Sequence, residues 1–263
     1  MFTWKKIRNI WQEFKKTLGL SLVLAQIDFK LRNEGSYLGI LWYLLNPFLM
    51  FALLWFIFSS QLGQNIYLYP AYLLLGLITF NFFQQATNES ANIILASGGL
   101  IKSTKFPYQS LVLAVVFRSL FSHIFEIIVF IGFLLFLKIN FLGVIFYPLF
   151  LFFYLLFVCG VSLMLAIITV YIIDFSNIWR FFSLLLWFAT PIFYSSSYAG
   201  PAGQIINTVN PIYYFITIFR DLLIYAKIPS LTIIIIPIFY SLATFIISGL
   251  VFNRLKYKMA EKI

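Results

Sequence analysis

The chain has 263 residues, of which 62% are hydrophobic and only 10% are charged. Soluble domains average about 45–50% apolar and about 25% charged residues, so the composition excludes an ordinary soluble protein and predicts an integral membrane protein. The formal net charge of +10 does not by itself indicate a nucleic-acid partner, because its meaning depends on where the basic residues lie relative to the membrane. With one His and one Cys, the chain offers no metal-binding pattern.

The N-terminal residues predict two amphipathic helices. Apolar residues recur at helical spacing in the segment 2–18, where they are Trp4, Ile7, Trp11, Phe14 and Leu18. Basic residues occupy the other faces, and a similar pattern continues through residues 20–34. Helices of this kind lie in the membrane interface. We therefore expect residues 1–36 to form cytoplasmic interface and elbow helices, and a simple surface anchor is the alternative.

The remaining residues, 37–263, predict an all-α domain with six transmembrane helices. A helix needs about 20 mostly apolar residues to cross the hydrocarbon. The candidate spans lie at about residues 37–60, 70–88, 110–137, 142–170, 178–195 and 231–252. Pro47 lies inside the first of them, where the missing N–H predicts a bend.

The distribution of Lys and Arg predicts the orientation of these spans. With a cytoplasmic N-terminus, fourteen of the 18 basic residues fall on the cytoplasmic side and three fall outside. Positive residues accumulate on the cytoplasmic side of membrane proteins, so we expect both termini to be cytoplasmic. The basic excess is then mainly a topology signal, and it also favours contact with anionic lipid headgroups.

Two segments between the spans predict additional structure. In the cytoplasmic loop, Ser97-Gly98-Gly99 interrupts a helix and Phe106-Pro107 stops the short segment that follows. That loop is either a docking surface for a soluble partner or an ordinary connection. On the outside, residues 196–230 predict short re-entrant or gate helices. Within them, Asn210-Pro211 is typical of an N-cap followed by Pro at the first helical position.

The sequence contains no evident energy source for transport. The phosphate-binding pattern GxxxxGK[ST] is absent from the 263 residues. Ionisable residues inside a membrane are candidates for function, and His123 and Glu126 lie three residues apart in the third predicted span. They are either a proton relay or a polar pair that holds helices together.

Several local motifs resemble the membrane subunit of ABC-type polysaccharide and polyol-phosphate exporters, a family that includes O-antigen, capsule and teichoic-acid permeases. The elbow motif comprises Lys30, Arg32, Ser36, Leu38, Gly39, Trp42, Asn46 and Pro47. Further matches are Phe106-Pro107, the segment from Thr190 through Pro191 to Tyr194, Asn210-Pro211 and the helix with Arg220-Asp221. The family often carries Arg-Asp where this chain has Ile173-Asp174, which places any salt bridge of that Arg in doubt.

The resemblance implies a homodimeric permease of the bacterial inner membrane, bound to two separate ABC ATPase subunits. ATP and Mg²⁺ would bind those subunits, so no cofactor and no enzymatic activity are expected on this chain. The substrate would be a glycan or polyol-phosphate polymer on a polyprenyl phosphate lipid.

The resemblance also implies roles for particular residues. The substrate-entrance candidates are Lys30, Arg32, Trp42, Asn46 and Pro47. The ATPase-coupling candidates are Leu100, Lys102, Lys105, Phe106 and Pro107. The outer-gate candidates are Pro191, Tyr194, Asn210, Pro211, Arg220 and Asp221.

Three alternatives remain open at the level of sequence. The first is an ABC permease of the same fold that exports a drug or a simple lipid. The second is a proton-coupled secondary transporter that uses His123 and Glu126. The third is a membrane-embedded glycan-transfer enzyme, for which Asp221 is the candidate catalytic carboxylate near the outside.

Overall fold

The computed structural model describes residues 2–31, 37–103, 107–138, 142–260 and 262, and these residues form helices and connecting loops without a strand. The helices are α1 (Phe2–Leu31), α2 (Trp42–Phe58), α3 (Tyr69–Ala96), α4 (Gly98–Ser103), α5 (Gln109–Phe136), α6 (Tyr147–Tyr171), α7 (Phe175–Ala189), α8 (Pro201–Val209), α9 (Pro211–Leu223) and α10 (Leu231–Ala260). Short 3-10 helices occupy Gly39–Leu41, Gly63–Asn65, Leu142–Phe146 and Ser196–Tyr198. The all-α prediction is confirmed for the described residues.

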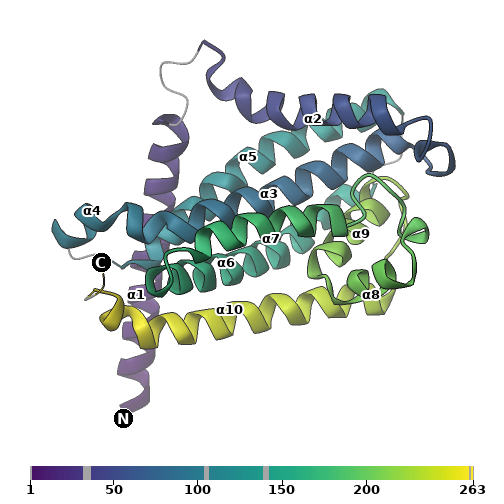
Figure 1. The fold of residues 1–263 in the computed structure, drawn as a ribbon. Helices are drawn as coiled ribbons and strands as arrows, with labels where there is room; N and C mark the ends of the chain where they lie inside the picture. Colours follow the sequence, from purple (N-terminus) through teal and green to yellow (C-terminus); the bar gives the residue numbers. More distant parts are fainter. Residues whose placement is uncertain (1, 32–36, 104–106, 139–141, 261, 263) are drawn as a thin grey trace.

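The longer helices run side by side, and α1 crosses them near one end (Figure 1). The N-terminus, α4 and the C-terminal end of α10 lie at that end of the bundle, which we call the basic end. The short helices α8 and α9 lie at the opposite end, which we call the outer end. Helix α3 packs on α5 and α6, and α10 packs along α6.

Aromatic rings fill the centre of the bundle. The fully buried large side chains include Phe80, Phe83, Tyr154, Phe215 and Phe219, from α3, α6 and α9. The rings of Tyr154 and Phe215 lie 4.6 Å apart, and the Tyr154 hydroxyl donates a hydrogen bond to the carbonyl of Thr79 at 3.0 Å. The helix after Asn210 is therefore part of the packed core, which fixes its position against α3 and α6.

Three of the predicted spans coincide with helices that are long and apolar enough to cross a membrane. Among the described residues these are Gln109–Phe136, Gly143–Tyr171 and Leu231–Lys256, and Leu44–Phe58 is a shorter apolar helix. The third and fourth predicted spans thus match helices of nearly the expected bounds, and residues 139–141 between them lie outside the described residues. Several apolar helices on an all-helical chain are consistent with an integral membrane protein.

Some predicted boundaries are wrong. Residues 2–31 form one continuous helix rather than two. No Pro interrupts this segment, and a Cβ atom added at Gly19 would meet no heavy atom within 4 Å. Helix α3 continues to Ala96, well beyond the predicted end at residue 88. Helix α7 ends at Ala189 rather than near residue 195, since Pro191 follows and cannot continue the hydrogen-bond pattern. Helix α9 ends at Leu223, four residues before Lys227, where the sequence predicts the end of this helix.

A stripe of small residues docks α1 against α5. Thr17, Ser21 and Ala25 are buried and recur every four residues, so they lie on one face of the helix. Ala25 packs in a cluster with Ala114 and Phe117 of α5. Small side chains allow two helix backbones to approach closely, whereas Trp11 and Phe14 lie on the exposed side.

We predict that Ala25→Leu weakens the docking of α1 on α5. The fully buried site leaves no room for three more carbon atoms, and overpacking of this kind costs about 1–3 kcal/mol. The melting temperature of the detergent-solubilised protein should fall. Val23→Leu on the exposed side of α1 is the control, and equal melting temperatures for the two variants would contradict close packing at Ala25.

Candidate functional site

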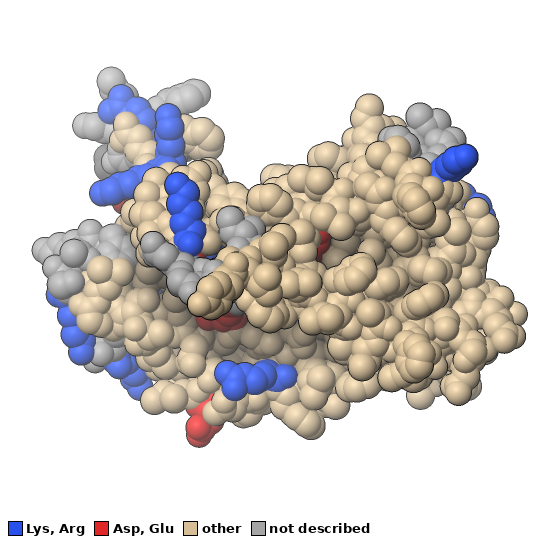
Figure 2. Space-filling view, turned by 90° about the horizontal axis from the view of Figure 1, so that it is seen from above, with Lys and Arg blue, Asp and Glu red and all other residues tan. Residues whose placement is uncertain are grey.

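Basic side chains gather at the end of the bundle where α1 crosses. Figure 2 shows most of the visible Lys and Arg residues on the side of α1 and α4, whereas the rest of that face is largely uncharged. The sequence carries Lys and Arg in α1, in α4 and in the last turns of α10, which all reach this end. The clustering therefore follows from the helix arrangement.

A buried cation joins three helices near the basic end. The Arg118 guanidinium of α5 forms ion pairs with Glu89 of α3 and Asp28 of α1, the latter at 3.4 Å. Only 14% of the Arg118 side chain is exposed, and a partly buried pair is screened less by water and salt than a surface pair. The arrangement ties the interface helix α1 to two helices of the bundle.

The entrance candidates lie on two successive helices. Lys30 is exposed in the last turn of α1, and Trp42 and Asn46 are exposed one turn apart at the start of α2. Pro47 is buried in the same helix, which continues through it to Phe58. Arg32 lies outside the described residues. Gly39 adopts φ +46°, a left-handed conformation that glycine reaches without steric cost, and it lets the chain turn into α2.

The coupling candidates surround α4. This helix begins at Gly98, directly after the interruption at Ser97, and it projects from the bundle at the basic end (Figure 1). Leu100 and Lys102 are exposed on it, and Pro107 is partly buried just before α5. Lys105 and Phe106 lie outside the described residues.

At the outer end, Arg220 binds the irregular backbone segment that follows α7. Its guanidinium donates to the carbonyls of Pro191 and Ile192, each at 2.8 Å, and to the carbonyl of Tyr72 at 3.1 Å. Burial lowers the pKa of Arg220, yet an arginine stays charged at neutral pH. Three carbonyl oxygens thus surround a buried cation and satisfy the backbone where α7 has ended.

Tyrosines of α3 extend this contact. The Tyr72 ring lies 3.3 Å from the Arg220 guanidinium carbon, a cation–π arrangement. The Tyr72 hydroxyl donates to the carbonyl of Tyr194 at 2.9 Å, and the Tyr69 hydroxyl donates to that of Phe193, also at 2.9 Å. Each carbonyl of residues 191–194 therefore accepts a hydrogen bond from Tyr69, Tyr72 or Arg220, which holds this segment along the start of α3.

Asn210 links the same segment to α9. Its Oδ1 accepts a hydrogen bond from the backbone N–H of Ile212 at 3.0 Å, and its Nδ2 donates to the Thr190 hydroxyl at 2.8 Å. Pro211 occupies the first helical position. The predicted N-cap is confirmed. The structure brings together Pro191, Tyr194, Asn210, Pro211 and Arg220, in what we call the outer knot.

Asp221 differs from its neighbour in the helix. The sequence suggests a charged pair, but the Arg220 guanidinium bonds to carbonyls, and Asp221 is only partly buried. Burial raises the pKa of Asp221, and the nearby Lys227 opposes this shift.

A second polar cluster is buried inside the bundle. His123 and Glu126 of α5 approach to 3.5 Å, and His123 Nε2 lies 2.7 Å from the Tyr147 hydroxyl of α6. The His123 ring also stacks on Phe82 of α3, at 5.1 Å between centroids. The cluster joins three helices, and it is enclosed by aromatic side chains.

Among the described residues, no three His, Cys, Asp or Glu side chains are grouped for a metal ion. The basic end and the outer knot are the two candidate regions. The basic end combines an exposed helix with a buried ionic junction, and the outer knot fixes an irregular segment. Irregular backbone at membrane depth persists only when it is buried in protein or lines a water-filled cavity.

Sequence reasoning missed several residues of these regions. Glu89 was assigned to a loop, so its contact with Arg118 was not foreseen. Tyr72 and Gly76 gave no local signal, because their roles depend on a residue near position 220. The small residues at 17, 21 and 25 did carry a signal, namely their spacing of four.

These features define a class of protein. It is an all-helical integral membrane protein in which short helices lie at the basic end and at the outer end of an apolar bundle. The sequence pattern of the family described as ABC-2 type transporter matches residues 20–224. The chain belongs to this ABC-2 type transporter family, which indicates a transporter rather than an enzyme.

Curated relatives resemble most of the chain. An O-antigen export system permease protein RfbA from Klebsiella pneumoniae is 28% identical over 250 residues, which cover 92% of this chain and 94% of the relative. A second protein of that name from the same organism is 28% identical over 249 residues. A protein of the same name from Myxococcus xanthus is 26% identical over 226 residues, covering 83% of this chain and 85% of the relative.

We predict that Gly76→Ala destabilises the outer knot. A Cβ atom at this position would lie 2.6 Å from an Arg220 nitrogen and 3.1 Å from the Ile192 carbonyl oxygen, so the guanidinium must shift. Overpacking should cost about 1–3 kcal/mol and lower the melting temperature. In Gly132→Ala the added atom meets open space, and that helix should gain roughly 0.5–1 kcal/mol. Equal melting temperatures of Gly76→Ala and Gly132→Ala would contradict tight packing around Arg220.

Proposed function

We propose that this chain is the permease subunit of an ATP-driven exporter that moves a lipid-linked polysaccharide or polyol-phosphate polymer out of the cytoplasm. The observation that carries the proposal is the likeness to O-antigen export permeases, which spans 92% of the chain in the first of them. The protein would work as a homodimer with two separate ATPase subunits in the bacterial inner membrane. Each copy would have six spans, with both termini in the cytoplasm.

The proposed orientation agrees with the distribution of charge. Positive residues favour the cytoplasmic side, and the basic end carries α1, α4 and the last turns of α10 (Figure 1). In this orientation the ATPase would meet α4, on which Leu100 and Lys102 are exposed. The outer knot would lie near the opposite membrane surface, where a polymer leaves.

Movement would pass from the ATPase into the bundle through contacts at the basic end. Helix α4 follows α3 with one intervening residue, and α3 carries Glu89. Arg118 joins Glu89 to Asp28, so a displacement of α3 is shared with α1 and α5. ATP hydrolysis would thus be converted into helix movement without a nucleotide site on this chain.

The entrance would recognise the phosphate of the lipid carrier. Lys30 is exposed at the end of α1, and an ammonium group binds phosphate as a point charge. Trp42 and Asn46 follow on the exposed face of α2, where an aromatic ring and an amide offer contacts to sugar. The outer knot fixes the backbone of residues 191–194, so it would form a rigid edge of the polymer exit.

Deletion of the gene tests the proposal. The deletion strain should accumulate lipid-linked glycan on the cytoplasmic side of the membrane, because synthesis continues without export. Expression of the wild-type chain should remove the accumulated glycan, and an ATPase subunit should co-purify with the tagged chain. If no lipid-linked glycan accumulates, an exporter of a drug or a simple lipid becomes the better explanation.

We predict that Glu126→Gln retains export. In the proposed mechanism Glu126 is a structural partner of His123, and the amide keeps the size of the side chain, so stability should fall by no more than about 0.5–1.5 kcal/mol. Transport into inverted vesicles, which corresponds to export from the cell, should continue with ATP after an uncoupler has removed the pH gradient. Loss of export in the variant, together with export driven by a pH gradient alone, would instead support the proton-coupled transporter.

A further inference from the structure

A pocket between α1 and the bundle lies apart from the entrance candidates and the outer knot. It encloses about 550 Å³ and is lined by α1, the start of α5, α6 and α10. This volume lies within the range of about 300–1,000 Å³ that is usual for small-molecule sites. None of the entrance or outer-gate residues lines it, and Pro107 is the single coupling candidate among its lining residues.

One face of α10 makes the pocket apolar at one end and polar at the other. Phe245, Gly249 and Phe252 line its apolar part, and Asn253 and Lys256 follow toward the C-terminus. The eleven residue steps from Phe245 to Lys256 span about 16 Å at 1.5 Å per residue. The pocket is therefore elongated along the helix, and it passes from aromatic walls to a polar and charged end.

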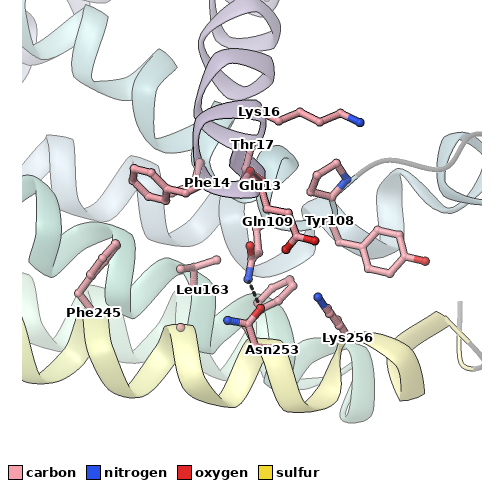
Figure 3. A pocket seen from close by; sticks show the side chains of 14 residues that line it. Glu13, Phe14, Lys16, Thr17, Tyr108, Gln109, Leu163, Phe245, Asn253 and Lys256 are labelled. Atoms are coloured by element: carbon pink, nitrogen blue, oxygen red, sulfur yellow. Dashed lines mark hydrogen bonds between the residues drawn. The ribbon is translucent and has the colours of Figure 1, made fainter. Parts of the chain in front are cut away.

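The other walls repeat this division. Leu163 of α6 and Phe14 of α1 contribute to the apolar part, whereas Glu13 and Lys16 lie at the polar end. Figure 3 shows Glu13 and Lys256 pointing into the space between α1 and α10, with Lys16 at the rim. Two lysines against one glutamate leave the polar end with a net positive charge.

Polar contacts shape that end as well. Gln109 of α5 donates from Nε2 to Oδ1 of Asn253 on α10, at 3.3 Å (Figure 3). This bond links α5 and α10 at the pocket, and Tyr108 also lines it. Clustered lysines near a membrane surface attract anionic lipids, and Lys16 and Lys256 line this pocket beside its apolar wall.

We propose that this pocket binds one anionic phospholipid of the cytoplasmic leaflet. The phosphate lies at the end with Lys16 and Lys256, and one acyl chain follows the aromatic stripe toward Phe245. The volume admits the phosphate end and part of one chain, so the rest of the lipid stays in the bilayer. The bound lipid supports α1 by filling the space between α1 and α10. This inference takes from the proposed function only that the basic end faces the cytoplasm.

Gly249 offers a way to close the pocket without disturbing the fold. A Cβ atom at Gly249 would meet no heavy atom within 4 Å, so Gly249→Leu places its side chain in the open space. Gly132→Leu is the matched control, because Gly132 also lies in an apolar helix with open space at its Cβ. Neither residue belongs to the entrance, coupling or outer regions.

Native mass spectrometry of the detergent-purified full chain counts the lipid that remains bound. After incubation with phosphatidylglycerol, the wild type and Gly132→Leu should each hold one molecule per chain, and Gly249→Leu should hold almost none. Lys256→Gln should weaken binding of phosphatidylglycerol about fivefold and leave the weaker binding of phosphatidylcholine unchanged. Inorganic phosphate should not displace the lipid, because it lacks the acyl chain.

Equal retention by Gly249→Leu and the wild type would overturn the site. Equal binding of the two phospholipids would overturn its preference for anions, and displacement by inorganic phosphate would reduce it to a simple anion site. The readout is bound lipid rather than export. Failure of the proposed export function would therefore leave the expected binding result unchanged, and the two failures are distinguishable.

Discussion

The structure depends on the way in which buried backbone groups are satisfied where a helix stops. Inside a membrane protein each carbonyl without a partner costs several kcal/mol, and the chain leaves helical geometry directly after α7. The Arg220 guanidinium meets this demand by donating to Pro191, Ile192 and Tyr72. One cation thereby fixes the relative positions of α3, α9 and the irregular segment, and no carboxylate partner is needed.

Helix α3 connects this contact with the basic end. It carries Tyr72 and Gly76 beside Arg220, and it carries Glu89 in the ion pair with Arg118. The thirteen residue steps from Gly76 to Glu89 span about 20 Å. Most of this stretch is buried against α5 and α6. Helix α3 therefore contributes contacts both to the outer knot and to the ion pairs of the basic end.

Local patterns predicted the helices well and their partners poorly. The spans at residues 110–137 and 142–170 and the N-cap at Asn210 follow from short-range rules of hydrophobicity and capping, and the structure has them. The roles of Gly76 and Tyr72 rest on contacts with a residue more than 140 positions away, which no local pattern contains. The end of α3 was placed too early because its last turns are polar, although they pack against neighbouring helices.

The position of Arg220 late in the chain has a consequence for biosynthesis. Chains are made from the N-terminus, so α3 and the segment after α7 emerge before α9 does. A guanidinium in hydrocarbon is costly without partners, whereas the carbonyls that receive it already exist when it is synthesised. We therefore expect α9 to settle last among these three elements, and a ribosome-bound chain that ends before Arg220 to leave the Pro191 and Ile192 carbonyls without this guanidinium.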